Sequence, residues 1–194
     1  MPARRLDEAF FARPVREVAP ALLGAVIDVD GVGGEIVEVE CYRQDDPASH
    51  SFRGPTPRAA VMFGPPGRLY VYRSYGIHWC ANVVCEPEGI GAAVLVRAVA
   101  PRFGIDRMRE RRGAVPDRTL AAGPGRLCQA LGIDGTMNGS QVNEGPVRIL
   151  AGEPVRQVLT GPRIGISVAT ERPWRFGVAG SPHLSRPFPL EAAA

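Results

Sequence analysis

The sequence predicts an α+β fold: one domain, residues 1–194, with a curved, mostly antiparallel sheet, peripheral helices and a protruding β-hairpin. Three observations support this. The length of 194 residues suffices for one hydrophobic core and is short for two. Hydrophobic residues make up 45% of the chain and charged residues 22%, the usage of an ordinary globular protein. Several consecutive segments have the pattern of strands, whereas helical patterns are few.

Helical segments are expected on the periphery of this sheet. The first is expected over residues 14–23, because Pro14 suits a first helical turn and Gly24 can close the last one. Pro20 lies inside this stretch and is expected to kink or split the helix. The other helices are expected at residues 105–112 and 126–131.

Strand candidates are separated by turns rich in glycine. They are expected at residues 25–30, 35–42, 69–73, 77–85, 92–99 and 163–169. The first two flank a Gly-rich turn at residues 31–34, and the third and fourth form a hairpin with Tyr75 at or near its tip. Residues 43–68 read as a long irregular stretch, and loops of that length tend to be functional. The tail after about residue 186 is expected to be flexible.

The N-terminus and the cysteines indicate a cytoplasmic protein with no membrane segment. The opening stretch MPARRLDEAFFARP places charges where a signal peptide needs an apolar run, and no run is long enough to span a bilayer. The four cysteines form no CxxC pair, and three histidines do not complete a zinc pattern. We therefore expect reduced, buried thiols, no metal and no organic cofactor.

The positive charge is concentrated in the middle of the chain. The net charge is +3, but residues 50–112 hold ten Arg and four acids, which give +6. Such a patch suits a phosphate backbone, although charge alone fits a solvated face equally well. All 23 basic residues are Arg. Because no lysine can form a Schiff base, lyase chemistry is open only to the N-terminal amine.

The segment IVEVECY at residues 36–42 is the first candidate site. Alternation along a strand gives two opposite faces, with Val37, Val39 and Cys41 toward the core and Glu38, Glu40 and Tyr42 on the other side. A Glu beside an aromatic ring, at the start of a long loop, can act as a general base. The plainer interpretation is that both acids form the wet face of a half-exposed strand. The segment alone leaves both interpretations open.

The loop that follows holds His50, whose flat ring could form one wall of a pocket or could be structural. Arg53 and Arg58 in this loop, and Arg73 in the hairpin, are expected to reach phosphates.

The hairpin segment LYVYRSYGIHWCAN is rich in aromatic residues. Tyr70 and Tyr72 share one strand face, and Tyr75 lies at the turn. An aromatic cluster across the strands would stabilise the hairpin. An exposed aromatic tip within a basic patch can also enter the minor groove and replace an extruded base.

A set of short motifs then follows in order along nearly the whole chain. They are Glu38-x-Glu40-x-Tyr42, Ser49-His50-Ser51, Thr56-Pro57-Arg58, Met62-Phe63-Gly64-x-Pro66-Gly67, Leu69-Tyr70-Val71-Tyr72, Tyr75-Gly76, Cys80-x-Asn82, Leu95-x-Arg97, Gly123-Pro124, Leu127-Cys128-Gln129-Ala130-Leu131, Arg163-x-Gly165, Arg175-Phe176 and Gly180-Ser181. As an ordered set they resemble the alkyladenine (3-methyladenine) DNA glycosylase family. The chain departs from the family pattern at Cys41, where alanine is common, and at Ala59, where Asn is usual.

This resemblance implies a monofunctional glycosylase that flips damaged purines out of duplex DNA. Glu40 corresponds to the base that deprotonates water for attack on the sugar C1′. Arg97 corresponds to the residue that positions this water, helped by the backbone carbonyl of Ile164. The implied partner is double-stranded DNA with damaged purines, bound by a monomer.

The resemblance also implies a pocket for the flipped base. Tyr42 and His50 would stack on one side of the base, and Tyr72 on the other. Asn82 would obstruct normal guanine through its exocyclic amino group, and Tyr75 would be the intercalating wedge. The range of lesions, whether methylated, deaminated or etheno purines, stays open.

Two other functions are kept as alternatives. The basic patch and the wedge would suffice for a nucleic-acid-binding protein without catalysis, and Glu40 could serve a hydrolase of free nucleosides. A helix-hairpin-helix glycosylase is disfavoured, because Gly123-Pro124-Gly125-Arg126 lacks that motif's spacing and no suitable downstream Asp follows.

Overall fold

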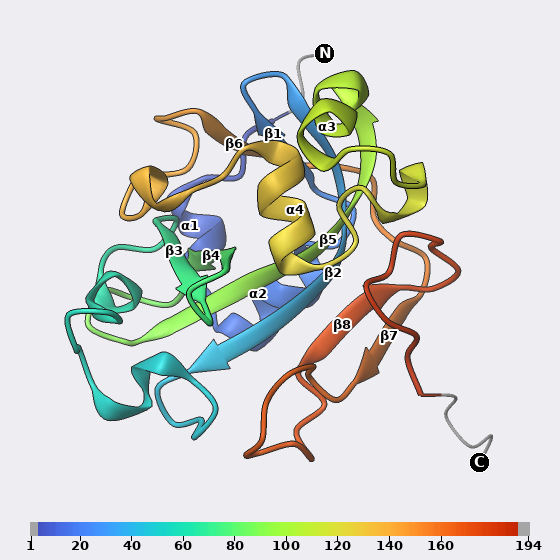
Figure 1. Cartoon of the computed structure of the whole chain (residues 1–194). Helices are drawn as coiled ribbons and strands as arrows, with labels where there is room; N and C mark the ends of the chain where they lie inside the picture. The colour runs from blue at the N-terminus through green and yellow to red at the C-terminus, as the bar shows by residue number, and fades with distance from the viewer. Residues whose placement is uncertain (1–3, 190–194) are drawn as a thin grey trace.

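A curled antiparallel sheet is the framework of the protein, whose computed structural model describes residues 4–189 (Figure 1). The strands run in the order β3-β4-β5-β2-β1-β6, and a β7–β8 hairpin adds to β2. Their bounds are β1 (Val26–Val29), β2 (Val32–Arg43), β3 (Leu69–Ser74), β4 (His78–Val84), β5 (Ala92–Phe103), β6 (Val147–Leu150), β7 (Val158–Gly161) and β8 (Arg175–Val178). The predicted α+β class with a mostly antiparallel sheet is thus confirmed.

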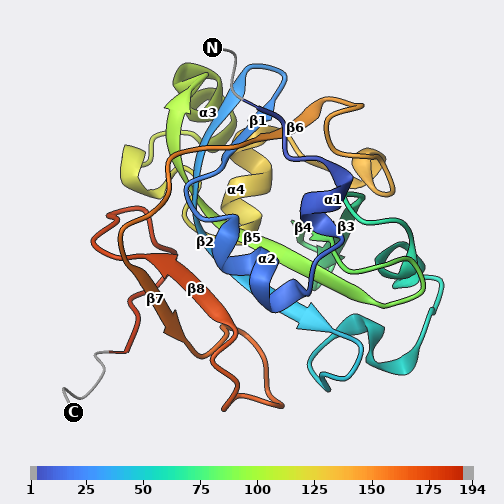
Figure 2. The same cartoon turned by 180° about the vertical axis from the view of Figure 1, so that it is seen from behind.

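Short helices pack on both sides of this sheet. They are α1 (Glu8–Phe11), α2 (Val15–Ala21), α3 (Ile105–Arg112) and α4 (Pro124–Leu131), with single-turn 3-10 segments at η1 (His50–Arg53), η2 (Ala60–Phe63), η3 (Asp117–Thr119) and η4 (Gly135–Met137). Figure 2, seen from behind, shows α1 and α2 on one side of the sheet, with α3 and α4 on the other. Pro14 precedes α2 as predicted, and Pro20 is accommodated in the last turn of an unbroken helix.

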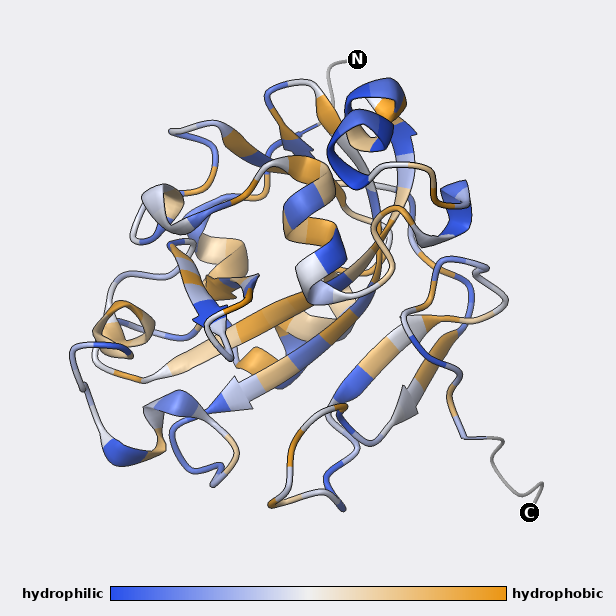
Figure 3. Ribbon diagram, viewed as in Figure 1, coloured by the Kyte–Doolittle hydropathy of each residue, from blue (hydrophilic) through white to orange (hydrophobic). Residues whose placement is uncertain are grey.

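The core lies where these helices meet the sheet. Val18 and Leu22 of α2 and Leu127 of α4 are fully buried, as is Val94 of β5. Figure 3 shows that β5 is apolar along much of its length, whereas α3 is mostly hydrophilic. The central strands are therefore covered on both sides, which fixes the position of any side chain that they carry.

A tight turn sets the register of the β1–β2 hairpin. Asp30 and Gly31 both have positive φ, 48° and 79°, as in the type I′ turn that suits a two-residue hairpin. Gly33 and Gly34 lie within β2 and not in the turn predicted at residues 31–34. A Cβ at Gly33 would stand 1.9 Å from the Ile27 carbonyl oxygen, so glycine there permits close strand approach.

A β-bulge interrupts β2 close to the two acids. The register with β5 pairs Ile36 with Val99 and Glu38 with Ala98, so Val37 is the extra residue. Ile36 and Val39 pack in the main core, whereas Val37 is buried outside it. The predicted core face therefore holds from Val39 onward, but Val37 does not share it because the bulge shifts the alternation.

The C-terminal third departs most from the sequence prediction. Residues 163–169 form a loop and not a strand, because Gly165 has φ of 78° and Pro162 precedes Arg163. The strands of this part of the chain come before and after this loop in the sequence, as β7 and β8. β6 and α1 were not predicted either.

The segment after β8 folds back onto the sheet. The carbonyl oxygens of Arg186 and Pro187 accept hydrogen bonds from Arg175, whose guanidinium lies 3.8 Å from the centre of the Phe188 ring. The expected loose tail thus does not begin at residue 186, and residues 190–194 lie outside the described part.

Candidate active site

The carboxylate of Glu40 is completely buried at the point where β2 meets β8 and the loop after β7. Oε2 accepts a 2.8 Å hydrogen bond from the Tyr42 hydroxyl. Oε1 accepts a 2.8 Å bond from the Ile164 backbone N–H and lies 3.2 Å from Arg97 Nη1. The exposed fraction of Glu40 is 0%, so the wet-face interpretation of this strand is wrong. Ile164 contacts Glu40 through its backbone N–H, whereas its carbonyl was expected to help position the water.

Arg97 reaches Glu40 from the neighbouring strand β5. Its Nε donates to Glu38 Oε1 at 3.1 Å and its Nη2 donates to Ser185 Oγ at 3.3 Å. Burial by itself lowers the pKa of Arg97, but the charges of Glu40 and Glu38 outweigh it, and the pKa is raised. Arg97 is therefore a fixed cation beside Glu40.

Tyr42 stands with its ring against a buried arginine. The guanidinium of Arg163 lies 4.7 Å from the Tyr42 ring centre and 5.1 Å from that of Trp174. Arg163 also forms an ion pair with Asp46, and both side chains are fully buried. Burial, followed by the charge of Glu40, raises the pKa of Tyr42, so its hydroxyl stays protonated as the donor to Glu40.

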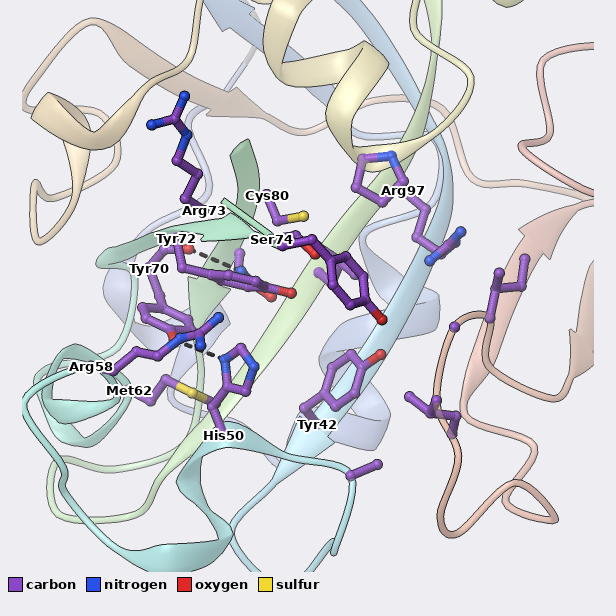
Figure 4. Close-up of a pocket in the computed structure, with 18 of the residues that line it drawn as sticks. Tyr42, His50, Arg58, Met62, Tyr70, Tyr72, Arg73, Ser74, Cys80 and Arg97 are labelled. Atoms are coloured by element: carbon purple, nitrogen blue, oxygen red, sulfur yellow. Dashed lines mark hydrogen bonds between the residues drawn. The ribbon is translucent and has the colours of Figure 1, made fainter. Parts of the chain in front are cut away.

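His50 and Tyr72 form a second aromatic wall. Their ring centres are 4.6 Å apart in an edge-on contact, and Tyr70 stacks on Tyr72 at 5.3 Å. His50 Nδ1 and the Tyr70 hydroxyl share a 2.9 Å hydrogen bond, which ties His50 to this side. Figure 4 shows Tyr42 standing apart from the pair. The expected sandwich put His50 on the side of Tyr42, whereas in the structure the His50 ring contacts Tyr72; how these rings enclose a base stays a prediction.

A cavity of about 560 Å³ lies between these walls. Tyr42, His50, Tyr72, Asn82 and Arg97 all line it. The Asn82 side chain donates a 2.9 Å hydrogen bond to the Tyr70 carbonyl oxygen, which fixes the amide. Small-molecule sites commonly have a volume of about 300–1,000 Å³, and this one is large enough for a purine.

The β3–β4 hairpin carries Tyr75 at the mouth of the cavity. Tyr75 is 89% exposed and has φ of 49°, a conformation in which a non-glycine residue is uncommon. Ile77 is also 67% exposed. A non-glycine residue held in such a conformation costs free energy, and residues of this kind cluster at functional sites.

The three arginines expected at phosphates occupy different positions. Arg58 and Arg73 line the cavity (Figure 4). Their guanidinium groups lie 5.2 and 5.5 Å from the ring centres of Tyr72 and Trp79, respectively. Arg53 ends η1 and is exposed outside the cavity lining. Ala59 stands where the family usually has Asn. Its backbone N–H bonds to Thr56, so the turn that contains Arg58 is closed without an Asn side chain.

The sequence did not predict a role for several residues around the site. Glu38 was grouped with Glu40 but given no role, and it proves to bind Arg97, Arg175 and Ser185. The pairing partners of Glu38 lie 59 to 147 residues away, so no local pattern shows them. The ordered motifs that contain Arg163 and Arg175 were a signal that could have pointed to these residues.

The rest of the described chain adds little further chemistry. Among residues 4–189 no three His, Cys, Asp or Glu side chains gather as a metal site would need. In the same range no helix is long and apolar enough to cross a bilayer. All four cysteines are buried and free, and burial raises the pKa of Cys41 to about 12.

The fold and the site together place a buried carboxylate behind an aromatic cavity that is large enough for a flat ring. The sequence model of the family described as Methylpurine-DNA glycosylase (MPG) matches residues 9–182. A relative from Nitrosospira multiformis is 58% identical over 89% of this chain and 89% of its own. Relatives from Nitrobacter winogradskyi and Agrobacterium fabrum are 56% and 52% identical over 94% of this chain, and 88% and 93% of theirs. All three are provisionally named 3-methyladenine DNA glycosylases.

The chain belongs to the methylpurine-DNA glycosylase family. It is a DNA-repair enzyme that hydrolyses N-glycosyl bonds of alkylated purines, and DNA is its substrate. The resemblance drawn from the ordered motifs is confirmed.

Proposed function

We propose that the protein flips an alkylated purine from duplex DNA into the aromatic cavity and cleaves its glycosidic bond with a water activated by Glu40. The observation that carries this proposal is the buried Glu40 carboxylate, held by Tyr42, Arg97 and Ile164 beside that cavity. Catalytic bases are typically placed in this way, with the acceptor oxygen aimed by fixed donors.

The contacts of Glu40 leave acceptor capacity for a water. A carboxylate offers about four acceptor positions. In the described part of the chain, Ile164 and Arg97 reach Oε1 and Tyr42 reaches Oε2, so Oε2 keeps an acceptor position that a water could use. A water that donates to Oε2 would lie beside Tyr42, next to the cavity. Arg97 lines the cavity and would hold the water oxygen.

The step balances with no cofactor. The water oxygen forms a bond to C1′ while the bond from C1′ to the purine nitrogen breaks, and Glu40 takes the water proton. A 3-methylated or 7-methylated purine is cationic in the nucleotide, so it takes the bond electrons and leaves neutral. Charge that develops on the sugar is stabilised by the nearby carboxylate, as in glycoside hydrolysis.

The cavity walls suit a cationic, flat base. Tyr42 faces the wall formed by His50 and Tyr72, and electron-rich Tyr faces attract cations. Burial raises the pKa of Tyr72, so its ring stays neutral. Asn82, fixed by its bond to Tyr70, would meet the exocyclic amino group of guanine and disfavour the normal base.

Flipping is assigned to the hairpin tip, and the arginines around the cavity are assigned to the DNA backbone. Tyr75 would fill the gap that the extruded base leaves, and alkylated purines stack poorly, which lowers the cost. Arg53, Arg58 and Arg73 would contact phosphates on either side.

Glu40→Gln tests the proposal, with Glu35→Gln as a matched control. Glu35 lies on the same strand, but it is partly exposed and pairs with Arg102. Single-turnover excision would be measured on duplexes that carry 3-methyladenine, 7-methylguanine, hypoxanthine or ethenoadenine. Glu40→Gln should slow excision by about 10²–10⁴-fold with lesion binding retained, whereas Glu35→Gln should match wild type.

Near-normal turnover by Glu40→Gln would overturn the role of this carboxylate. Hydrolysis of free nucleosides without activity on duplexes would overturn the flipping mechanism and favour a nucleoside hydrolase.

A further inference from the structure

The segment after β8 returns to the two acids of β2. β8 pairs with β2 over Glu38–Glu40, with Glu40 opposite Arg175. Seven residues beyond β8, the backbone N–H of Ser185 donates to Glu38 Oε2. The Ser185 hydroxyl donates to Glu38 Oε1 at 2.8 Å. This contact brings a residue from the C-terminal part of the chain to the interior of the site.

Ser185 also contacts Arg97 directly. Arg97 Nη2 donates to the Ser185 hydroxyl at 3.3 Å, Nε donates to Glu38, and Nη1 lies against Glu40. Each nitrogen of the guanidinium thus has its own partner. A planar group held at three corners cannot rotate about its own axis, so Nη1 is kept beside Glu40.

The Ser185 hydroxyl is both a hydrogen-bond donor and a hydrogen-bond acceptor in this arrangement. It donates to Glu38 and accepts from Arg97, and one small group therefore joins the anion to the cation. Glu38 is 0% exposed and Arg97 is buried, whereas Ser185 itself is partly exposed. Without it, Arg97 Nη2 would lose a partner in a buried site.

We infer that Ser185 is a positioning residue which, together with Glu38, holds Arg97 in register with Glu40 and the attacking water. This inference rests on the proposed roles of Glu40 and Arg97. Ser185 acts through Arg97 and does not touch the substrate. Its loss should reduce the rate of bond cleavage and leave DNA binding unchanged, since the wedge and the cavity walls are elsewhere.

The test compares Ser185→Ala, Ser185→Thr and the matched control Ser181→Ala. Ser181 lies in the same segment, and its hydroxyl accepts from the His183 N–H and not from Arg97. Ser185→Ala keeps the backbone N–H that binds Glu38, so the segment should stay docked. The readouts are the single-turnover excision rate on a 3-methyladenine duplex, the affinity for that duplex and the melting temperature.

Ser185→Ala should excise about tenfold more slowly with unchanged duplex affinity, because a buried charged group loses one hydrogen bond. Ser185→Thr should restore most of the rate, and Ser181→Ala should match wild type. A wild-type rate for Ser185→Ala would overturn the inference. Equal rate losses in Ser185→Ala and Ser185→Thr would also overturn it, because the hydroxyl would then not be the active group.

Glu40→Gln in the same assay separates this inference from the proposed function. An inactive Glu40→Gln beside a fully active Ser185→Ala overturns only the role of Ser185. An active Glu40→Gln overturns the proposed function and, with it, this inference.

Discussion

Replacing Arg163 with methionine should cost the protein about 3 kcal/mol of unfolding free energy, at the lower end of the range for breaking a buried ion pair. Arg163 and Asp46 are both fully buried. The substitution removes two contacts to Asp46 and a 3.2 Å hydrogen bond to the Cys41 carbonyl oxygen. Methionine keeps much of the volume, so the main loss is the charge that neutralised Asp46.

The structure explains why the loss stays near 3 kcal/mol. Arg172 lies 3.7 Å from Asp46 and is partly exposed, so it can supply some compensating charge. Asp46 also keeps a hydrogen bond from the Ala48 N–H. The rings of Tyr42 and Trp174 lose the guanidinium of Arg163 but keep an apolar neighbour in the methionine side chain.

Urea unfolding measures this cost. With a slope of about 2 kcal/mol per molar urea, the midpoint should fall by about 1.5 M. The double substitution Arg163→Met with Asp46→Asn removes both charges and should recover part of the loss. A loss below about 1 kcal/mol, or a double variant no better than the sum of the single ones, would refute the reasoning.

Three further predictions concern DNA binding and pH. Tyr75→Ala should bind a lesion duplex about tenfold more weakly with a melting temperature within about 2 °C of wild type, because the side chain is 89% exposed; unchanged affinity would count against the wedge. Duplex affinity should fall steeply with salt, and Arg73→Ala should lower the slope of log K against log salt by about 1; a flat salt response in the wild type would contradict phosphate binding. Burial, followed by the charge of Arg58, lowers the pKa of His50 from about 6.5, so the unfolded chain binds the proton first and stability should fall as pH drops below about 6.5. Urea melts at pH 7.5 and 5.5 should show a smaller fall for His50→Gln, and an equal fall would exclude His50 as its source.

The strands that could be predicted are those with long, regular patterns. β2 and β5 have twelve residues each, and the hairpin of β3 and β4 has a clear turn at Tyr75 and Gly76. The strands that were missed, β6, β7 and β8, have four residues each, too few for alternation to stand out. β1 is equally short, but the Gly-rich turn that follows it marked it as a strand. Their pairing depends on partners far along the chain, which local patterns do not show.

The site was predicted through its ordered motifs and not through its geometry. Alternation placed Glu38 and Glu40 on one face, but it could not tell a wet face from a buried one. The partners that bury them, Arg97, Arg175 and Ser185, come from β5 and from the C-terminal segment. Only the folded sheet brings these segments together, and only the bulge at Val37 explains why the core alternation changes there.

The pairing of β8 with Glu38–Glu40 has a consequence for synthesis of the protein. A nascent chain that has emerged as far as β6 already contains both acids, Arg97 and the aromatic walls. It still lacks Ile164, Arg175 and Ser185, the groups that complete the environment of the acids. Competence to cut glycosidic bonds would therefore arise only after residues 164–185 have emerged from the ribosome, and a nascent fragment that ends at β6 would be unable to create abasic sites.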